Sequence, residues 1–301
     1  MRTSSIFPHG LIFVAGFLLV RPALATVNMV YVPVGDVGNT ADASTGYGAV
    51  SYAYNIGKYE VTNAQYADFL KAKGASNSAG IYYSGMASYG INQSGSSGSY
   101  TYSVTSGYEN MPAVYVTWFD AARFCNWLGN GQGSASMETG AYTLISGQTS
   151  GIVTVNPGAS IYIPSEDEWY KAAYYNGGNS TYSLYPNGKN TITTAEANYG
   201  SFGGHSTAVG SYGGDPSYYG TFDQGGNVWE WNDAVVNDTR RAMRGGSWTG
   251  TQSFLSSSFR SYDAPTTESN GLGFRVASVP EPTSVVLAIF GSGTLLIRRK
   301  R

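Results

Sequence analysis

Reactive side chains are scarce in this chain, whose 301 residues include one cysteine and two histidines. A thiol acts as a nucleophile when a neighbouring base such as histidine activates it, and no histidine lies near Cys125 in the sequence. Cys125 instead falls with Ala121, Phe124 and Leu128 at the i, i+3, i+4, i+7 spacing of one helix face. Buried cysteine packs as a small apolar side chain. We therefore predict a structural role for Cys125 in preference to a catalytic one, and no internal disulfide.

Three segments carry the signals that begin and end helices. The predicted caps are Thr62 or Asn63, then Thr117, then Ser165, which forms a capping box with Glu168. The corresponding helices are expected to end before Gly74, at Gly129 and at Tyr174. In the first helix, Tyr66, Phe69 and Leu70 are expected to face inward.

The remaining chain is predicted to be irregular. Short candidate strands lie at Met29–Val34, Tyr54–Lys58, Tyr142–Leu144, Ile152–Val155 and Ile161–Ile163. Long loops rich in Gly, Ser, Tyr and Asn are expected at residues 75–108 and 176–222. With 40 glycines and 25 tyrosines, the chain is predicted to form one loop-rich α+β domain.

The charge of this domain excludes one class of partner. Residues 26–278 keep 11 of the 17 basic and 18 of the 19 acidic side chains, a net charge of −7. An acidic surface without a basic stripe does not attract a phosphate backbone. We therefore expect no nucleic-acid ligand.

The first 25 residues have the pattern of a secretory signal peptide. Arg2 supplies the positive start, 11–20 form an apolar run, and Ala-Leu-Ala at 23–25 is a cleavage pattern that leaves Thr26 as the mature N-terminus. The alternative, a buried N-terminal core segment, is less consistent with these flanks. We therefore predict export of the chain.

The C-terminal end, residues 279–301, has a three-part pattern. Val-Pro-Glu-Pro at 279–282 precedes an apolar stretch at 283–297, and the chain closes on four basic residues at 298–301. This pattern resembles the bacterial PEP-CTERM sorting signal, which implies transient membrane anchoring through 283–297 and processing by exosortase-type machinery. The alternative is a plain C-terminal membrane anchor. Either interpretation places the domain outside the cytoplasm, at the cell envelope or the bacterial surface.

Five ordered motifs within residues 29–278 resemble the formylglycine-generating enzyme family, also called sulfatase-modifying factors. They are Asn-Ile-Gly-Lys-Tyr-Glu-Val-Thr-Asn-Ala-Gln-Tyr at 55–66, Met-Pro-Ala-Val-Tyr-Val-Thr-Trp at 111–118, Pro-Ser-Glu-Asp-Glu-Trp at 164–169, Gly-Gly-Asn-Val-Trp-Glu-Trp at 225–231, and Arg-Gly-Gly-Ser-Trp at 244–248 with Gly-Phe-Arg at 273–275. The resemblance implies an elaborated C-type-lectin-like fold over one domain, 26–278.

The residues that perform the family's oxidation are missing from this chain. In the family, two cysteines after the Gly-Gly-Ser-aromatic run bind copper as thiolates, and those positions fall at or near Gly250 and Leu255. Cys125 alone cannot supply a pair. A related branch of sulfoxide-forming enzymes uses iron held by several histidines, but after leader removal only His205 remains. We therefore expect neither copper nor iron, and we favour a non-catalytic protein.

A calcium site is what the resemblance still implies. The family's calcium positions fall on two carboxylates and two backbone carbonyls, at Asp223, Gly226, Val228 and Glu230. A second, weaker site falls on Asn198 and the Tyr199 carbonyl. The alternative is that Asp223 and Glu230 only cap turns. We expect calcium in a structural role.

The segment after the Gly-Gly-Ser-Trp run is the predicted ligand face. In relatives it forms a substrate groove or a variable binding surface. Trp248 is expected in the core, and the ligand-facing candidates are Ser247, Phe259, Arg260 and Tyr262.

Three functions follow from these observations. The first is an exported, surface-associated, non-catalytic domain that binds a glycan, a peptide or an envelope protein. The second is an oxidoreductase that converts a cysteine of an exported sulfatase to formylglycine. The third is a structural extracellular-matrix protein. The cysteine content favours the first.

Overall fold

The structure, a computed structural model, describes residues 26–280. The predicted signal peptide and all but the first two residues of the predicted sorting segment lie outside the described residues. Between residues 26 and 280, no helix is both long enough and apolar enough to cross a membrane.

Three α-helices form where their caps predict. They are α1 (Asn63–Lys73), α2 (Trp118–Gly129) and α3 (Glu166–Tyr174). Each begins with a complete capping box, in which the side chains of Thr62, Thr117 and Ser165 accept from the backbone N–H three residues later. These short-range bonds explain why local sequence was sufficient to place the helices.

Two four-stranded sheets organise the domain. The first has the order β1 (Tyr31–Val34), β2 (Tyr54–Gly57), β12 (Ala277–Ser278) and β5 (Ile161–Tyr162). It pairs the beginning of the described chain with its end. The second has the order β10 (Ser261–Asp263), β9 (Arg240–Arg244), β8 (Trp229–Val236) and β11 (Leu272–Phe274). Of its strands, β11 runs parallel to β8, whereas β9 pairs antiparallel with both β8 and β10.

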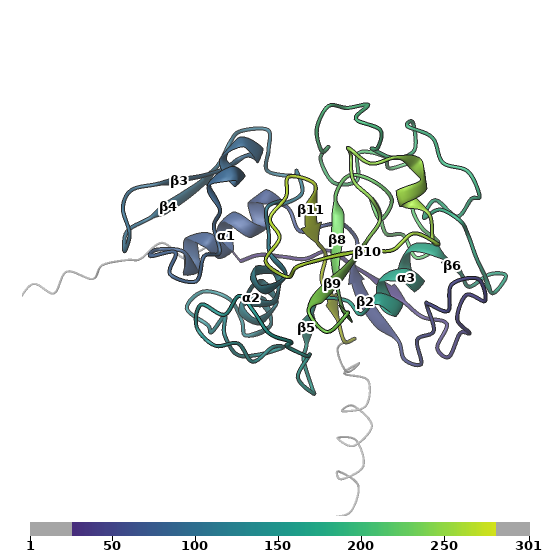
Figure 1. The fold of residues 1–301 in the computed structure, drawn as a ribbon, viewed down its shortest axis with the longest axis horizontal. Coiled ribbons are helices and arrows are strands. Elements are labelled where there is room, and N and C mark those ends of the chain that lie inside the picture. The colour runs from purple at the N-terminus through teal and green to yellow at the C-terminus, as the bar shows by residue number, and fades with distance from the viewer. Residues whose placement is uncertain (1–25, 281–301) are drawn as a thin grey trace, which may run out of the picture.

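Smaller elements lie outside the two sheets, mostly in segments that were predicted to be loops. The predicted loop at 75–108 is wrong in part, because it contains a 3₁₀ helix η1 (Ser84–Tyr89) and a hairpin of β3 (Ile91–Ser94) and β4 (Thr101–Val104). The polar composition hides this hairpin, which packs on the main core through Ile91 and Tyr102. The Tyr102 hydroxyl also donates to the Gly74 carbonyl at 2.8 Å. The predicted loop at 176–222 is irregular apart from a two-residue pairing of β6 (Tyr175–Asn176) with β7 (Thr181–Tyr182). Figure 1 shows the hairpin and these long loops at opposite ends of the molecule.

Two predicted strands, Tyr142–Leu144 and Ile152–Val155, do not form. The Asn126 side chain bonds both backbone groups of Tyr142. Its amide oxygen accepts from the Tyr142 N–H at 2.8 Å, and its NH₂ group donates to the Tyr142 carbonyl at 3.0 Å. The Arg241 guanidinium likewise donates to the Val153 carbonyl. Side chains from distant segments therefore satisfy the backbone groups that a strand partner would otherwise bond.

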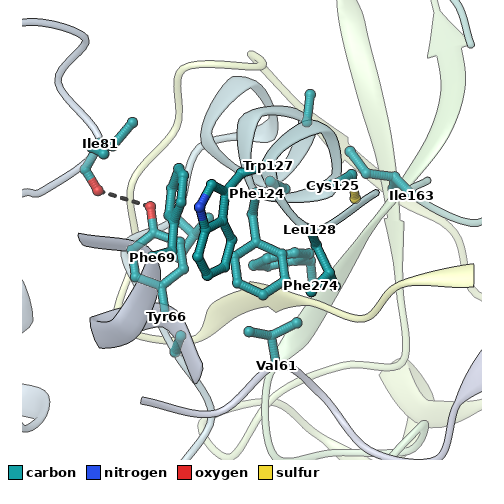
Figure 2. Close-up of a cluster of buried hydrophobic side chains, with 14 of the residues drawn as sticks. Val61, Tyr66, Phe69, Ile81, Phe124, Cys125, Trp127, Leu128, Ile163 and Phe274 are labelled. Carbon is teal, nitrogen blue, oxygen red and sulfur yellow. Dashed lines mark hydrogen bonds between the residues drawn. The ribbon is translucent and has the colours of Figure 1, made fainter. Parts of the chain in front are cut away.

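The main core lies between α1, α2 and β11 (Figure 2). Phe69 meets Trp127 with ring centroids 5.3 Å apart, and Phe124 meets Phe274 at 5.4 Å. Cys125 of α2 is fully buried, as predicted, and burial raises the pKa of its thiol well above the usual value. A thiol that stays protonated is a poor nucleophile, so the structural interpretation of Cys125 is supported.

Candidate functional site

The Arg-Gly-Gly-Ser-Trp motif forms a tight turn at the end of β9. Gly245 and Gly246 have φ of 96° and 76°, a region that side chains rarely enter. A methyl group on Gly245 would lie 2.8 Å from the Gln224 carbonyl oxygen, and one on Gly246 would lie 2.8 Å from Leu255. Both glycines are therefore required by backbone geometry and close packing.

The two positions that the family reserves for cysteines are filled by apolar packing. Leu255 is fully buried in a cluster with Tyr185, Ile192 and Ala197. A methyl group on Gly250 would lie 2.9 Å from the Phe254 ring. Apolar side chains therefore surround both positions.

Ser247 is buried rather than ligand-facing. It is 2% exposed, and its hydroxyl lies 3.1 Å from the Thr249 hydroxyl. A methyl group on Gly271 would lie 3.3 Å from the Ser247 hydroxyl oxygen. In this arrangement Ser247 stabilises the turn, and the prediction that it faces a ligand is not supported.

Arg260 is committed to an ion pair. Its guanidinium binds Glu166 in a fork, with N–O distances of 2.8 and 2.7 Å, and Arg244 donates to the same carboxylate at 2.8 Å. Tyr47 lies near both guanidinium groups, with its ring centroid 4.6 Å from Arg244 and 5.6 Å from Arg260. Bidentate pairing holds an arginine in one geometry, so Arg260 belongs to a structural network.

The other two predicted ligand-facing residues differ from each other. Phe259 packs against Phe254, with centroids 4.5 Å apart, and against Trp229 at 5.9 Å. Tyr262 is 41% exposed on the edge strand β10, with the Arg240 guanidinium 5.4 Å from its ring. Of the four candidates, Tyr262 therefore presents the most accessible ring.

A cleft of about 240 Å³ lies beside the motif and was not predicted. We call it the tyrosine cleft, and its lining consists of Ser88, Tyr89, Tyr108, Met111, His205 and Ser206. Two loops meet here, because the Val209 N–H donates to the Asn110 carbonyl at 2.8 Å. The abundance of tyrosine in both loops was the available signal, but their meeting depends on tertiary structure.

The tyrosine cleft is connected to Trp248 through one asparagine. The Asn270 amide donates to the Tyr89 hydroxyl at 2.6 Å, and the Trp248 indole N–H lies 3.4 Å from the Asn270 carbonyl oxygen. Trp248 is only partly buried, which corrects its predicted place in the core. Asn270 thus bonds both to Tyr89 of the cleft and to Trp248 of the motif.

The two predicted calcium-binding carboxylates, Glu230 and Asp223, differ in how many of their oxygens are already bonded to protein groups. Both Glu230 oxygens are engaged, since Arg275 donates to them at 2.5 and 2.6 Å and the Trp169 indole N–H donates at 2.7 Å. Asp223 accepts from the Gly210 N–H at 2.6 Å, and burial raises the pKa of its carboxyl to about 6. Within residues 26–280, no group of three or more acidic, cysteine or histidine side chains is arranged to hold a metal. The Glu230 carboxylate is therefore committed to Arg275 and Trp169, and calcium at Asp223, Gly226, Val228 and Glu230 stays a prediction.

Asn198, from the weaker predicted site, fits a cation better. It is 2% exposed, and its side-chain oxygen has no hydrogen-bond partner among the described residues. A buried oxygen without a partner is a suitable ligand for a hard cation. The Tyr199 carbonyl lies 3.4 Å from the Phe202 N–H in a weak turn contact, so it is not strongly committed.

Glu60 is a charged residue that the sequence analysis did not single out. It is fully buried near Asp223 and Glu230, and burial followed by these neighbouring charges raises the pKa of its carboxyl well above the usual value. One of its oxygens accepts from Asn227 at 3.0 Å. Glu60, Asp223 and Glu230 thus form a group of three carboxylates around Arg275. This group brings together residues more than 200 positions apart in the chain.

Comparison with known sequences identifies relatives of the chain. Residues 19–279 match the family described as sulfatase-modifying factor enzyme 1-like domain. Hercynine oxygenase of Mycobacterium tuberculosis is 24% identical over 253 residues, covering 75% of this chain and 52% of that protein. The inactive C-alpha-formylglycine-generating enzyme 2 of Mus musculus is 27% identical over 186 residues, covering 56% and 49%. The chain spans about half the length of these two relatives.

Comparison with solved structures identifies similar folds. Treponema denticola variable protein 1 has a TM-score of 0.57 at 21% identity, covering 86% of this chain and 98% of that one. The crystal structure of CarF has a TM-score of 0.57 at 22% identity, covering 84% and 99%. At such identities the likeness concerns the fold alone. It confirms the predicted irregular, loop-rich α+β fold.

Proposed function

The chain belongs to the sulfatase-modifying factor enzyme 1-like domain family, and from this premise we propose that it is an exported, non-catalytic member that binds a glycan. The proposed binding site is the tyrosine cleft together with the adjoining Trp248. A peptide or an envelope protein is the alternative ligand, and each would use the same face.

The observation that carries the proposal is the packing at Gly250 and Leu255. A thiolate pair needs two cysteines with room for a metal between them, whereas Phe254 and Leu255 occupy this space. The single cysteine of the chain, Cys125, is buried in a different part of the domain. The retained fold therefore favours binding over oxidation.

The composition of the tyrosine cleft favours a glycan. Sugar rings present C–H faces that pack on aromatic rings, while their hydroxyl groups bond to polar side chains. The cleft offers both, since Tyr108 is 38% exposed at its wall and His205, Ser88 and Ser206 line it. No charged side chain lines this cleft within the described residues, so a neutral glycan is the expected class.

Export and surface display are part of the same proposal. The signal-peptide pattern at 1–25 supports export, and the Pro-Glu-Pro, apolar and basic pattern at 279–301 supports anchoring and exosortase-type processing. A surface position would give the cleft access to extracellular polysaccharide.

A glycan array tests the binding proposal directly. The full-length chain in detergent should bind a subset of neutral glycans, and Tyr108→Ala should weaken that binding at least tenfold. Tyr218→Ala is the matched control, because Tyr218 is 51% exposed but does not line the cleft. Binding to peptides alone would favour the alternative ligand. No binding to either array would favour a structural matrix protein.

A separate assay tests the oxidoreductase alternative. The chain would be incubated with copper, oxygen and a cysteine-containing sulfatase peptide, with an active family enzyme as positive control. We expect no mass change in the peptide. Conversion of its cysteine to formylglycine by this chain would overturn the non-catalytic assignment.

A further inference from the structure

A second and larger cleft, of about 370 Å³, lies away from the Gly-Gly-Ser-Trp motif. It is bounded by β5, the first turn of α3, an irregular part of β8, the loop at 155–159 and Val279. We call it the acidic cleft. Its volume lies within the range of about 300–1,000 Å³ that is usual for small-molecule sites. It contains none of the residues that the sequence predicted to be functional.

Glu168 forms one acidic group of this cleft. It is fully buried, and its oxygens accept from the Tyr162 hydroxyl at 2.8 Å, the Tyr52 hydroxyl at 3.2 Å and the Ser165 N–H at 2.7 Å. These bonds hold the carboxylate and the two tyrosine rings in fixed positions. Glu168 therefore supplies a preorganised negative charge.

Asp233 forms the second acidic group and is less completely paired. The β8–β9 register shifts between Trp231 and Val235, which places Asp233 in an irregular part of β8. Its Oδ1 atom accepts from Arg241 at 3.1 Å, whereas its Oδ2 atom has no hydrogen-bond partner among the described residues. The side chain is 18% exposed and lines the cleft. One carboxylate oxygen is thus available to a ligand.

The balance of charge at this cleft is negative. Among the described residues, the lining includes Glu168 and Asp233 but no lysine or arginine. Arg241 offsets one charge from outside the lining, where its guanidinium lies 3.6 Å from the Trp118 ring centroid and donates to the Asp233 carbonyl at 2.6 Å. When Glu168 and Asp233 are both ionised, one negative charge remains in excess of Arg241. This arrangement disfavours an anionic ligand and favours a cation.

The remaining walls of the cleft are largely apolar. Val155, Ala159, Ile163 and Val279 contribute hydrocarbon, and the Tyr52 ring is half exposed at the edge. A metal ion would leave these surfaces uncovered. An organic cation with a short hydrocarbon chain would contact both the walls and the carboxylates.

We propose that the acidic cleft binds an alkylammonium group, with the ammonium at the free oxygen of Asp233 near Glu168 and the hydrocarbon chain against Val155, Ala159 and Val279. The group could belong to a free alkylamine or to a lysine side chain of a peptide, because both present the same butylammonium chemistry. This site is independent of the tyrosine cleft, and either proposal stands if the other fails.

Calorimetric titration of the full-length chain with butylammonium tests the proposal. Butanol and butyrate serve as neutral and anionic ligands of similar shape. We expect butylammonium to bind at least tenfold more tightly than either. Equal affinity for butanol, or no binding of butylammonium at millimolar concentration, would overturn the proposal.

Two variants locate the binding. Asp233→Asn should weaken butylammonium binding at least tenfold, whereas Asp238→Asn, the same change at an exposed turn of the same sheet, should leave it unchanged. Ala159→Phe should also weaken it, by filling the cleft without altering a charge. Because Asp233→Asn removes a partner of Arg241, thermal melts accompany each titration, and Ala159→Phe decides the matter if Asp233→Asn does not fold. Unchanged binding in Ala159→Phe would refute this location.

A final pair of ligands distinguishes the source of the amine. Nα-acetyl-lysine methylamide presents the same ammonium on a peptide backbone. Tighter binding of this ligand than of butylammonium would identify a lysine side chain as the partner, and the reverse would identify a free amine.

Discussion

Glu230 and Asp233 lie three positions apart on β8, yet their surroundings are opposite. Both Glu230 oxygens bind Arg275, and the side chain is fully buried. Asp233 shares one oxygen with Arg241 and turns toward a cleft. A buried acid whose bonding capacity is filled stabilises a fold, whereas one that is partly bonded at a cavity can still bind a ligand. Along one strand, this difference distinguishes a structural ion pair from the carboxylate that we propose binds a ligand.

Of the substitutions proposed here, Arg275→Met should lower the unfolding free energy most. Arg275→Met leaves Glu230 buried without its cation, and loss of one partner of a buried pair costs about 3–5 kcal/mol of unfolding free energy. Urea unfolding monitored by fluorescence measures it. The double variant Glu230→Met/Arg275→Met should recover part of the loss, since it removes the isolated charge. If Arg275→Met lowers the unfolding free energy no more than Asp233→Asn does, Glu230 and Asp233 do not differ as proposed.

Truncation of Leu255 tests whether the segment that follows the Gly-Gly-Ser-Trp motif is as tightly packed as the surroundings of Glu230. Because Leu255 is fully buried in its apolar cluster, Leu255→Ala should lower the unfolding free energy by about 2–5 kcal/mol. Leu184→Ala, at a partly exposed leucine, provides the control. A cost near zero for Leu255→Ala would mean that this segment is loosely packed and open to a ligand.

The pH dependence of stability should sharpen the comparison at Asp233. Burial raises the pKa of its carboxyl to about 7 in the folded state, against about 3.9 in an unfolded chain. Between these values the folded state binds the proton more tightly, so stability should fall as pH rises from about 4 to 7. Asp120 and Asp223 have raised pKa values of the same sign and contribute to the total slope.

Asp233→Asn should reduce this slope relative to the unsubstituted chain. Thermal melts at several pH values measure the difference, and Asp238→Asn should leave the slope unchanged. An identical slope in Asp233→Asn would mean that Asp233 stays ionised in the folded state, as a fully paired carboxylate does.

Calcium should give the smallest effect. We propose that calcium binds at the unpaired Asn198 oxygen and stabilises the fold, so that EDTA lowers the melting temperature by a few degrees and calcium restores it. Asn198→Ala should remove this response. Glu230→Gln should retain it, because Glu230 is committed to Arg275. A melt that EDTA does not change would reject a structural calcium ion.

Local sequence was sufficient for some of these features. The capping boxes of α1, α2 and α3 depend on residues three positions apart. All three helix starts were predicted, but a capping box was predicted only at Ser165. The buried face of α2, with Phe124 and Cys125, followed from helical spacing. The strands predicted near Tyr142 and Val153 failed, because Asn126 and Arg241 bond to these segments from elsewhere in the chain.

The candidate site was harder to predict than the helices. Arg260 looked available, but Glu166 binds it from 94 positions away. Trp248 was expected in the core, yet it is only partly buried and contacts Asn270, which bonds to Tyr89 of the tyrosine cleft. The roles of these side chains depend on partners that no local pattern reveals.

The sequence by itself determined that no pair of cysteines can form within these 301 residues, because they contain one cysteine. It also determined the helices, whose first bonds are local. Only the tertiary structure decided that Glu230 is neutralised while Asp233 keeps a free oxygen. The physical reason is that the energy of a charge depends on which partners and how much water surround it, and both are set by segments distant in the chain.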